Sequence, residues 1–373
     1  MKSKREGFEI GFNLYDEISN EITVGDREQT TWSSIKHLCS SEVANNILRL
    51  IHGKKKSREI DSIVRSLKTH ISQSYEFYEI AKSAKAITSP LFYYYSFLNL
   101  AKALSNIRYP KFYQNNEYYR HGISWSPSRV YLVNVNTEEI SITSRGVWHT
   151  LLEFQQDKQV QIRNPTKLKV RDLFSVIPEV AIEYERTFHA QNKLIQIKNI
   201  DVLHDVNLQN VWICFSIGKE NLKNSNLTRP KFLNLISNSS ISFQNVKSED
   251  NDDWIFEQSN PKTIHNNSQK NIYSLLNVEK KALNLFSHPE ANRNVYLFSV
   301  QKNFPIRLTQ LQCRYSILFW LGSLVRYDPY SLDELQDSKY WILIDGFINQ
   351  SPALLLELFE WEFYKTETYI KTI

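Results

Sequence analysis

Residues 89–104 of the chain read SPLFYYYSFLNLAKAL, and this stretch decides the fold. Ser89 suits a helix N-cap, and Pro90 follows at the first helical position, where its missing N–H costs nothing. Apolar and aromatic side chains cover nearly every side of the helix that this spacing predicts. Because a helix that is apolar on nearly all sides is buried on nearly all sides, we predict a central core helix here.

Two polar residues, Asn99 and Lys102, interrupt the end of this apolar run. Buried polar groups need hydrogen-bond partners, and a buried ammonium needs a charge partner or loses its proton. One interpretation places both residues at an edge of the core, from which the side chains reach water. The other interpretation places them in an internal polar pocket, and the sequence leaves both open.

The composition is that of a globular protein with a large core. The 373 residues are 42% hydrophobic and 13% aromatic, with only 9 Gly and 11 Pro, which argues against a disordered chain. This length fits two domains, or one domain with an insertion. The net charge of +5 is compatible with a nucleic-acid partner without requiring one.

Targeting, membrane and cofactor signals are not found in the sequence. The first residues, MKSKREGFE, are charged, which excludes a signal peptide, and the longest apolar run, 315–325, is too short to cross a bilayer. The three cysteines are far apart and lack metal-site spacing, and no nucleotide-binding glycine motif, HExxH or GxSxG string occurs. We expect a soluble, cytoplasmic protein with no membrane partner, no metal and no cofactor.

Further helices are predicted on both sides of the central one. Residues 59–87 carry one apolar stripe and join the central helix tightly, which predicts an antiparallel hairpin. Residues 41–51 form a short capped helix. A second helix that is apolar on all sides runs from 308 to 327 and is the natural packing partner of the first. A last helix is predicted to start at Ser351-Pro352.

The middle third of the chain has a mixed pattern. Strands are predicted at 130–135, 138–143, 211–217 and 296–300, with the first two forming a β-hairpin. A short helix begins at 147, and 168–188 forms a longer helix kinked at Pro178. The polar, acidic stretch 246–270 is predicted to be a loop.

The predicted fold class is therefore α+β, mainly α. Residues 1–125 and 306–373 supply a helical core, and residues 126–305 form an inserted mixed α+β region. The two apolar helices are expected to pack against each other and to bring cationic residues that are distant in sequence into one neighbourhood.

Several separated blocks of the chain resemble the YaaC-like family of bacterial proteins. These blocks are residues 89–96 with 99–103, His121-Gly122, residues 321–329, and Trp341 followed by Phe347 and Ser351-Pro352. Their order and spacing match over most of the chain, and the middle third matches loosely. The resemblance implies no particular activity, because that family is largely uncharacterised.

A weaker resemblance is to HEPN-type helical domains, in which a tyrosine-containing central helix precedes a short polar motif with a histidine. The tyrosines at 93–95, followed by Arg120-His121-Gly122, are similar in layout. This resemblance implies a helical bundle, often dimeric, and an RNA-cutting toxin or defence factor, including antiphage defence.

The ribonuclease motif of that family, an arginine followed four to six residues later by a histidine, occurs once in a helix, at Arg65–His70. We discount it, because such a short string arises by chance in a chain of this size. Five helical residues also rotate the two side chains about 140° apart. Arg65 is therefore predicted on the polar face and His70 at the edge of the apolar stripe.

Two functions follow from these residues. In the first, which we favour, the chain is a non-enzymatic interaction module associated with nucleic acid or with a protein, such as a second copy of itself. His121 and Arg326 are then structural and close helix ends through carbonyls and a buried carboxylate.

In the second, the chain is an endoribonuclease. His121 acts as general acid or base with Arg120 beside it. The candidate phosphate-binding residues are Lys102, Asn99, Arg326 and Arg314. Interleaved aromatic and basic residues at 108–120 either stack on RNA bases or pack on the core.

Overall fold

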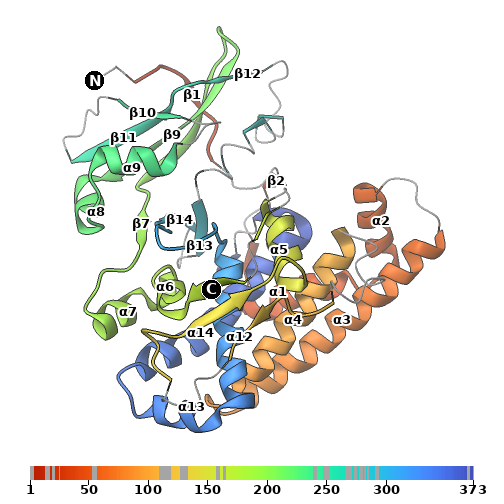
Figure 1. The fold of residues 1–373 in the computed structure, drawn as a ribbon. Coiled ribbons are helices and arrows are strands. Elements are labelled where there is room, and N and C mark those ends of the chain that lie inside the picture. Colours follow the sequence, from red (N-terminus) through yellow and green to blue (C-terminus); the bar gives the residue numbers. More distant parts are fainter. Residues whose placement is uncertain are drawn as a thin grey trace. The chain divides into compact units, whose positions relative to one another are not determined.

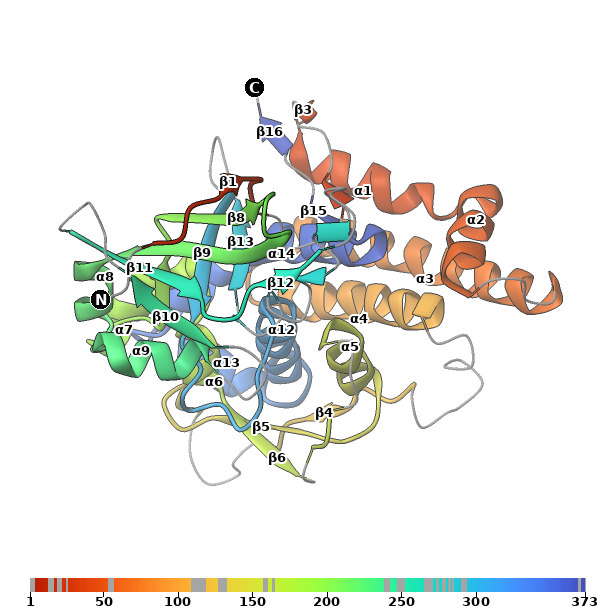
Figure 2. The ribbon, with the colours of Figure 1, turned by 90° about the horizontal axis from the view of Figure 1, so that it is seen from above.

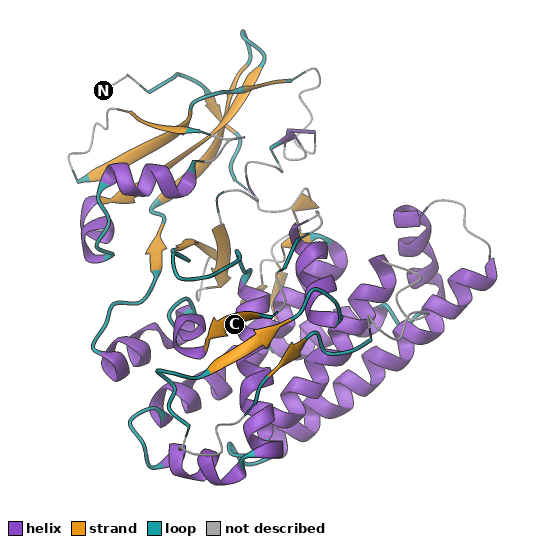
Figure 3. Ribbon diagram, in the orientation of Figure 1, coloured by secondary structure: helices purple, strands orange, loops and turns teal. Residues whose placement is uncertain are grey.

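The computed structural model describes a mainly helical chain with small sheets (Figures 1 and 3). It describes residues 4–12, 17–18, 22–24, 26–52, 57–108, 119–126, 133–156, 160–162, 165–237, 242–246, 252–264, 271–272, 275–276, 280, 283, 285–289, 294–367 and 370–372. With 55% helix and 18% strand, it confirms the α+β, mainly α class. Its contacts divide into a helical unit, residues 26–190 and 301–364, and a strand-rich unit, residues 1–25, 191–300 and 365–373.

The helical unit is built from long helices and one small antiparallel sheet. Its helices are α1 (Arg27–His37), α2 (Ser41–His52), α3 (Ser57–Ser83), α4 (Ser89–Arg108), α5 (Val147–Gln156), α6 (Val170–Phe174), α7 (Ala181–Phe188), α12 (Gln310–Tyr327), α13 (Pro329–Gln336) and α14 (Trp341–Tyr364). The sheet has the order β4 (Ile123–Ser124), β5 (Glu139–Ile142) and β6 (Thr166–Lys169).

Helices α3 and α4 form the predicted antiparallel hairpin, and Figure 2 shows them lying alongside each other. In its buried seam, the Ser74 hydroxyl donates to the Ser96 carbonyl at 2.8 Å. Nearer the open end, the Asn106 amide donates to the Ser66 hydroxyl at 3.0 Å. These bonds fix which residues of the two helices face each other, and the facing residues include the polar ones that interrupt the apolar pattern.

The two helices that are apolar on all sides, α4 and α12, pack against each other as predicted. A Cβ built on Gly322 would lie 3.3 Å from the Cβ of Tyr94, so glycine lets the two backbones approach closely. The Tyr94 ring centroid lies 5.6 Å from that of Tyr315 and 5.4 Å from that of Phe319. Aromatic pairs at this spacing add to the burial energy and make the contact specific.

The prediction that a last helix starts at Ser351-Pro352 is wrong. Helix α14 begins at Trp341 and continues through Pro352. Ser351, which the sequence assigns as an N-cap, is buried, and its hydroxyl donates to the carboxylate of Glu179. The serine therefore serves a contact with a distant residue and does not start a helix.

Helix α14 is also the described helix that is long and apolar enough to cross a membrane. More than half of its apolar window is buried inside the structure, at 56%. Core helices of globular proteins pass the same test of length and composition. The burial of α14 is that of a core helix.

Two carboxyl groups of α14 are buried where this helix packs on α1. Glu357 is 3% exposed and pairs with Arg27, whose Nε lies 2.5 Å from Oε1. Glu360 is 4% exposed. Burial, which the nearby charge of Arg27 only partly offsets, raises the pKa of both carboxyl groups to about 7.

We expect the free energy of unfolding to fall as the pH rises from about 4.5 to above 7. In the unfolded chain these carboxyl groups titrate near 4.5, so the folded state binds more protons over this interval. Glu360→Gln, which cannot ionise, should raise the melting temperature at pH 8 by about 5 °C and change it little at pH 4.5. Thermal melts at the two pH values test this.

The matched control is Glu334→Gln, which alters an exposed carboxylate of α13 and should shift neither melt. An equal effect of Glu360→Gln at both pH values would show that its ionisation does not destabilise the fold.

Two predictions for residues 126–190 are wrong. The predicted β-hairpin of 130–135 with 138–143 does not form, because strand β5 pairs with β4 and β6 and not with residues 133–135. Residues 130–132 of the predicted first strand lie outside the described part. The expected helix at 168–188 is a strand, helix α6, a 3-10 turn at Pro178–Val180 and helix α7. Proline therefore starts a new element here, since it cannot donate a backbone hydrogen bond.

The division of the chain also differs from the predicted one at 126 and 306. Helices α5, α6 and α7 contact α4, α12 and α14, so residues 126–190 lie in the helical unit. The inserted unit begins at 191 and ends at 300, and it also takes in residues from both ends of the chain.

The strand-rich unit contains one larger sheet and three small ones. Its elements are β1 (Phe8–Glu9), β2 (Glu17–Ile18), β3 (Ile22–Val24), β7 (Leu194–Gln196), β8 (Asn199–Asp205), β9 (Asn210–Gly218), α8 (Lys219–Asn224), α9 (Arg229–Ile236), β10 (Phe243–Val246), β11 (Asp253–Gln258), β12 (Lys262–Thr263), β13 (Leu285–Pro289), β14 (Asn294–Ser299), β15 (Thr366–Glu367) and β16 (Ile370–Thr372).

The larger sheet has the order β1-β8-β9-β11-β10, with β12 also paired to β9. One face is covered by α9, whose Phe232 ring lies 5.0 Å from that of Phe256. Strands β9 and β14 confirm the predicted strands at 211–217 and 296–300. The prediction of a loop throughout 246–270 is wrong, because β11 and β12 occupy part of it; residues 247–251 and 265–270 lie outside the described part.

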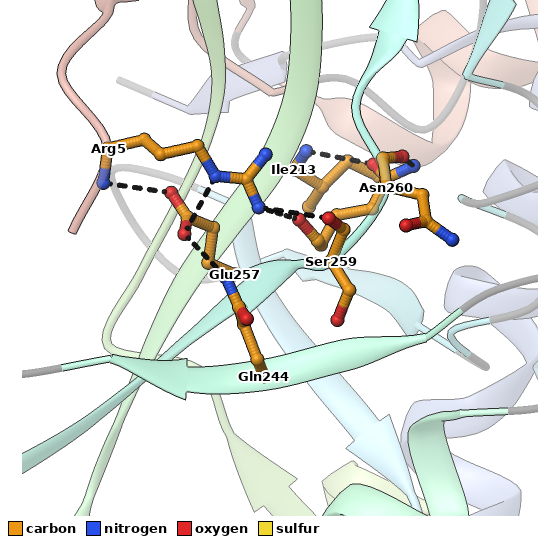
Figure 4. A network of polar contacts seen from close by, with 7 residues as sticks. Arg5, Ile213, Gln244, Glu257, Ser259 and Asn260 are labelled. Carbon is orange, nitrogen blue, oxygen red and sulfur yellow. Dashed lines mark hydrogen bonds and ion pairs between the residues drawn. The ribbon is translucent and has the colours of Figure 1, made fainter. Parts of the chain in front are cut away.

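Arg5 holds the N-terminal segment on the other face of this sheet (Figure 4). Its Nε lies 3.2 Å from Glu257 Oε2, and its terminal nitrogen donates to the Gln258 carbonyl at 2.6 Å. The guanidinium also lies 5.3 Å from the centre of the Trp212 ring. Because Glu257 is fully buried, an unpaired carboxylate would be costly there, and Arg5 compensates its charge.

Candidate anion-binding site

Three of the predicted site residues come together in the helical unit. Lys102 lies near the end of α4, Arg326 in the last turn of α12, and His121 in the turn before β4. Burial lowers the pKa of His121, and the positive charges of Lys102 and Arg326 lower it further. Helices α4 and α12 pack against each other, and the charges of Lys102 and Arg326 both act on His121.

His121 is oriented by a tyrosine of the central helix. The Tyr94 hydroxyl contacts the Nδ1 atom of the imidazole, and the two rings stack with centroids 5.7 Å apart. Burial raises the pKa of Tyr94 well above its usual value, so its hydroxyl keeps its proton. Which of the two atoms donates depends on the imidazole tautomer, and the Tyr94 hydroxyl is the donor when Nδ1 is unprotonated.

This hydrogen bond decides what His121 offers to a ligand. With its lowered pKa the imidazole is neutral at pH 7, so it carries one proton. In the tautomer in which Nδ1 accepts from Tyr94, that proton sits on Nε2. In this tautomer His121 has an N–H donor at Nε2, which suits an anion.

A second histidine, His70 of α3, belongs to the same neighbourhood. Its Nδ1 lies 2.9 Å from Asn99 Oδ1 and its Nε2 lies 3.0 Å from the Tyr119 hydroxyl. Asn99 donates its own amide to the Tyr95 carbonyl at 3.0 Å, so its oxygen faces the imidazole as an acceptor. His70 thus carries its proton on Nδ1, and both of its nitrogens are occupied.

The charge of Lys102 acts on both histidines. Burial lowers the pKa of its ammonium, and its charge lowers the pKa of both His70 and His121. The ammonium lies 5.0 Å from the centre of the Tyr119 ring. Lys102 is therefore half-buried and Asn99 is buried, and both lie among polar side chains. This agrees with the interpretation that places the two residues in an internal polar pocket.

Arg326 is exposed and lies between aromatic rings. Its guanidinium carbon is 5.7 Å from the centre of the Tyr95 ring and 4.6 Å from that of Tyr327. Within the described residues, neither Arg326 nor Lys102 has a carboxylate at ion-pair distance. From the sequence, Arg326 is expected to be structural, with a buried carboxylate as its partner. The contacts of the described residues show no such partner.

Arg120 and His121 line an open pocket of about 640 Å³ in front of β4. The other lining residues are Gly122, Ile123, Ser124, Thr143, Ser144 and Arg145. The first N–H groups of α5 donate to carbonyls of this turn, from Val147 to Arg120 at 2.8 Å and from Trp148 to His121 at 3.1 Å. The backbone carbonyl of His121 thus satisfies one N–H group in the first turn of α5.

Two glycines let this turn approach the start of α5. Gly122 has a φ of +75° and Gly146 a φ of +108°, which side-chain-bearing residues rarely adopt. A Cβ built on Gly146 would lie 2.6 Å from the Cα and the nitrogen of Gly122. The Gly122–Gly146 contact therefore requires glycine and fixes the backbone that carries Arg120 and His121.

Arg314 is not part of this site. Its Nε and one terminal nitrogen donate to the two carboxylate oxygens of Glu179 at 2.8 and 2.7 Å. Its other terminal nitrogen donates to Gln310 Oε1 at 2.7 Å. Burial raises the pKa of Glu179, but the charge and hydrogen bonds of Arg314 and the bond from Ser351 outweigh it, so the net pKa is lowered. Arg314 is a buried structural cation, and its donors are committed.

Two residues of the site were missed from the sequence. Tyr94 was assigned to the core by its apolar surroundings, and its contact with His121 depends on the tertiary fold. His70 was discounted with Arg65, which is indeed exposed while His70 is half-buried. The sequence signal that could have identified His70 as a site residue is its position at the edge of the apolar stripe of α3. A polar residue at such an edge can face the next helix of a hairpin.

Part of the predicted site cannot be placed. Residues 109–118 of the aromatic and basic segment lie outside the described part, which leaves Tyr119 and Arg120. Among the described residues, no group of three or more histidine, cysteine or carboxylate side chains could hold a metal ion.

The comparisons with known proteins give one match. The model of the YaaC-like protein family matches residues 37–363, which includes every residue of the site. No curated protein and no solved structure matches the chain. Because the family model covers most of the sequence, the chain belongs to the YaaC-like protein family.

Proposed function

We propose that this protein is a non-enzymatic nucleic-acid-binding module that holds a single strand of RNA at Lys102 and Arg326. The observation that supports this most is a cationic cluster with no carboxylate partner among the described residues, set between aromatic side chains. Cations without a carboxylate partner, one half-buried and one exposed here, attract an anion because nothing nearby cancels their charge.

The aromatic residues favour a nucleic acid over a simple anion. Tyr95 and Tyr327 flank the Arg326 guanidinium, and Tyr119 flanks Lys102. Alternating cations and aromatic faces are typical of proteins that bind single strands, where phosphates contact the cations and bases stack on the rings. Tyr327 is 59% exposed, so its ring is accessible to a base.

The hydrogen bonding of His121 favours binding over RNA cleavage. An endoribonuclease of the HEPN type would need a histidine that accepts a proton in the reaction. In the tautomer in which the neutral His121 accepts at Nδ1 from Tyr94, its Nε2 carries the proton. It can donate to a phosphate oxygen, but it has no vacant basic nitrogen. The antiphage toxin function that the HEPN resemblance implies is therefore the second candidate.

Lys102→Met tests the binding proposal, since methionine keeps the apolar stem and removes the charge. We expect affinity for a single-stranded RNA to fall about tenfold at low salt, and the slope of log K against log salt to weaken by about 0.7, as for one lost phosphate contact. Fluorescence anisotropy of a labelled RNA measures both. RNA recovered from the assay should be intact.

The matched control is Lys85→Met, an exposed lysine just beyond α3 that lies outside the cluster. It should leave both the affinity and the slope unchanged. The proposal fails if the wild-type protein binds no RNA, or if the two variants weaken binding equally. Cleavage that His121→Ala abolishes would support the nuclease instead.

A further inference from the structure

The open pocket beside His121 offers donors of the kind that bind a single phosphate group. His121, Arg120 and Ser124 line it, and Arg120 and Ser124 are exposed. An imidazole with its proton on Nε2, a guanidinium and a hydroxyl can each donate to an anion. No carboxylate occurs among the described residues that line the pocket. A site with guanidinium, N–H and O–H donors and no acidic residue favours an oxyanion over a cation or a neutral ligand.

We propose that this pocket binds the terminal phosphate monoester of a nucleic-acid strand, with His121 and Arg120 donating to its oxygens. This inference rests on the proposed function, because the strand itself would be held by Lys102 and Arg326.

Charge favours a terminal monoester over an internal phosphodiester. A phosphate monoester carries a charge of about −1.5 to −2 at pH 7 and has three terminal oxygens, whereas a phosphodiester carries −1 and has two. Arg120 lies in the pocket, and the charges of Lys102 and Arg326 reach His121. A dianion gains roughly twice as much from each of these cations as a monoanion does.

The donors are held by a rigid backbone. The N–H of Thr143 donates to the Gly122 carbonyl at 3.0 Å, and the first two N–H groups of α5 donate to the carbonyls of Arg120 and His121. Tyr94 fixes the imidazole from the side of α4. Donors whose positions are fixed before binding lose little conformational entropy when the ligand arrives, so they discriminate well between ligands.

The test compares three RNAs of one sequence on the full chain, with a 5′-phosphate, with a 3′-phosphate, and with hydroxyls at both ends. We expect one phosphorylated RNA to bind at least tenfold more tightly than the unphosphorylated one. The end that carries the preferred phosphate identifies the ligand. Inorganic phosphate at millimolar concentration should compete with that RNA and should leave the unphosphorylated RNA bound.

Arg120→Ala should remove this preference and keep the affinity for unphosphorylated RNA within about twofold. Because Arg120 is exposed, we expect the variant to melt at the wild-type temperature. Arg186→Ala, which removes an exposed arginine of α7, is the control and should keep the preference.

The outcomes separate this inference from the proposed function. Equal binding of the three RNAs by the wild-type protein overturns the terminal-phosphate site and leaves RNA binding standing. The site is also overturned if Arg120→Ala keeps the preference. Absence of binding to any of the RNAs overturns both.

Discussion

Arg314→Met is expected to lower the free energy of unfolding of the helical unit by about 3–5 kcal/mol. Arg314 is 2% exposed, and its two bonds to Glu179 compensate a carboxylate whose side chain is 3% exposed. Removing one partner of a buried ion pair leaves the other charge uncompensated in a medium of low polarity, which costs far more than an exposed pair would. A loss of this size is a large fraction of the stability of an ordinary domain.

A double-mutant cycle separates the pair from the packing of the side chains. Urea unfolding of Arg314→Met, Glu179→Gln and the double variant at pH 7 should show that the second substitution recovers at least half of the loss. The loss should also shrink below about pH 4.5, because Glu179 can then take up a proton. If Arg314→Met costs less than 1 kcal/mol, the ion pair does not stabilise this unit.

Gly146→Ala is expected to have the next largest effect, on both stability and ligand binding. A methyl group at this position would lie 2.6 Å from the Gly122 backbone, and a φ of +108° is unfavourable for alanine. The backbone strain alone costs roughly 1–3 kcal/mol, and relief of the clash requires the turn that carries Arg120 and His121 to move away from α5. We therefore expect a lower melting temperature and loss of the preference for a terminal phosphate.

Gly218→Ala is the matched control, since the nearest atom to its Cβ would be 3.7 Å away and its φ is −59°. It should change the free energy of unfolding by less than 1 kcal/mol and leave ligand binding unchanged. A Gly146→Ala variant that behaves in the same way would contradict the requirement for glycine at the Gly122–Gly146 contact.

The long helices could be predicted because each carries its own signals. The apolar spacing and the Ser-Pro start of α4, and the apolar run of α12, depend on residues within the helix itself. The pairing of these helices followed from their composition, because a helix that is apolar on all sides needs partners. Helix α1 was missed, since the mixed residues before 41 carry a weak periodicity and its capping residue, Asp26, stands alone.

Errors arose where a distant partner decides the local structure. Ser351 signals a helix start, but Glu179 accepts its hydroxyl, and the helix continues. Strand β11 lies within an acidic, polar stretch, and its Asp253 and Glu257 are compensated by Lys198 and Arg5 from elsewhere in the strand-rich unit. The composition of residues 246–270 shows these charges but does not show which distant residues pair with them. For this reason a loop is predicted there from the sequence.

The same limit applies to the candidate site. Lys102 and Arg314 are both cations within apolar helices, and no pattern in the sequence separates them. Their partners in the structure separate them. Arg314 is paired with a buried carboxylate, whereas Lys102 acts on the histidines and lies near an aromatic ring. The neighbourhood of Lys102, His121 and Arg326 was predicted from the pairing of two helices, but the protons on its histidines depend on hydrogen bonds that only the fold creates.

The strand-rich unit draws on the beginning, the middle and the end of the chain, since β2 pairs with β15 and β3 with β16. During synthesis on the ribosome, β2 and β3 must wait for residues more than 340 positions later, because β2 starts at Glu17 and its partner β15 at Thr366, and β3 starts at Ile22 and its partner β16 at Ile370. Helix α14, which packs on α1, is also made late. Both units can therefore be completed only after these late residues have been made, and until then the nascent chain should depend on chaperones.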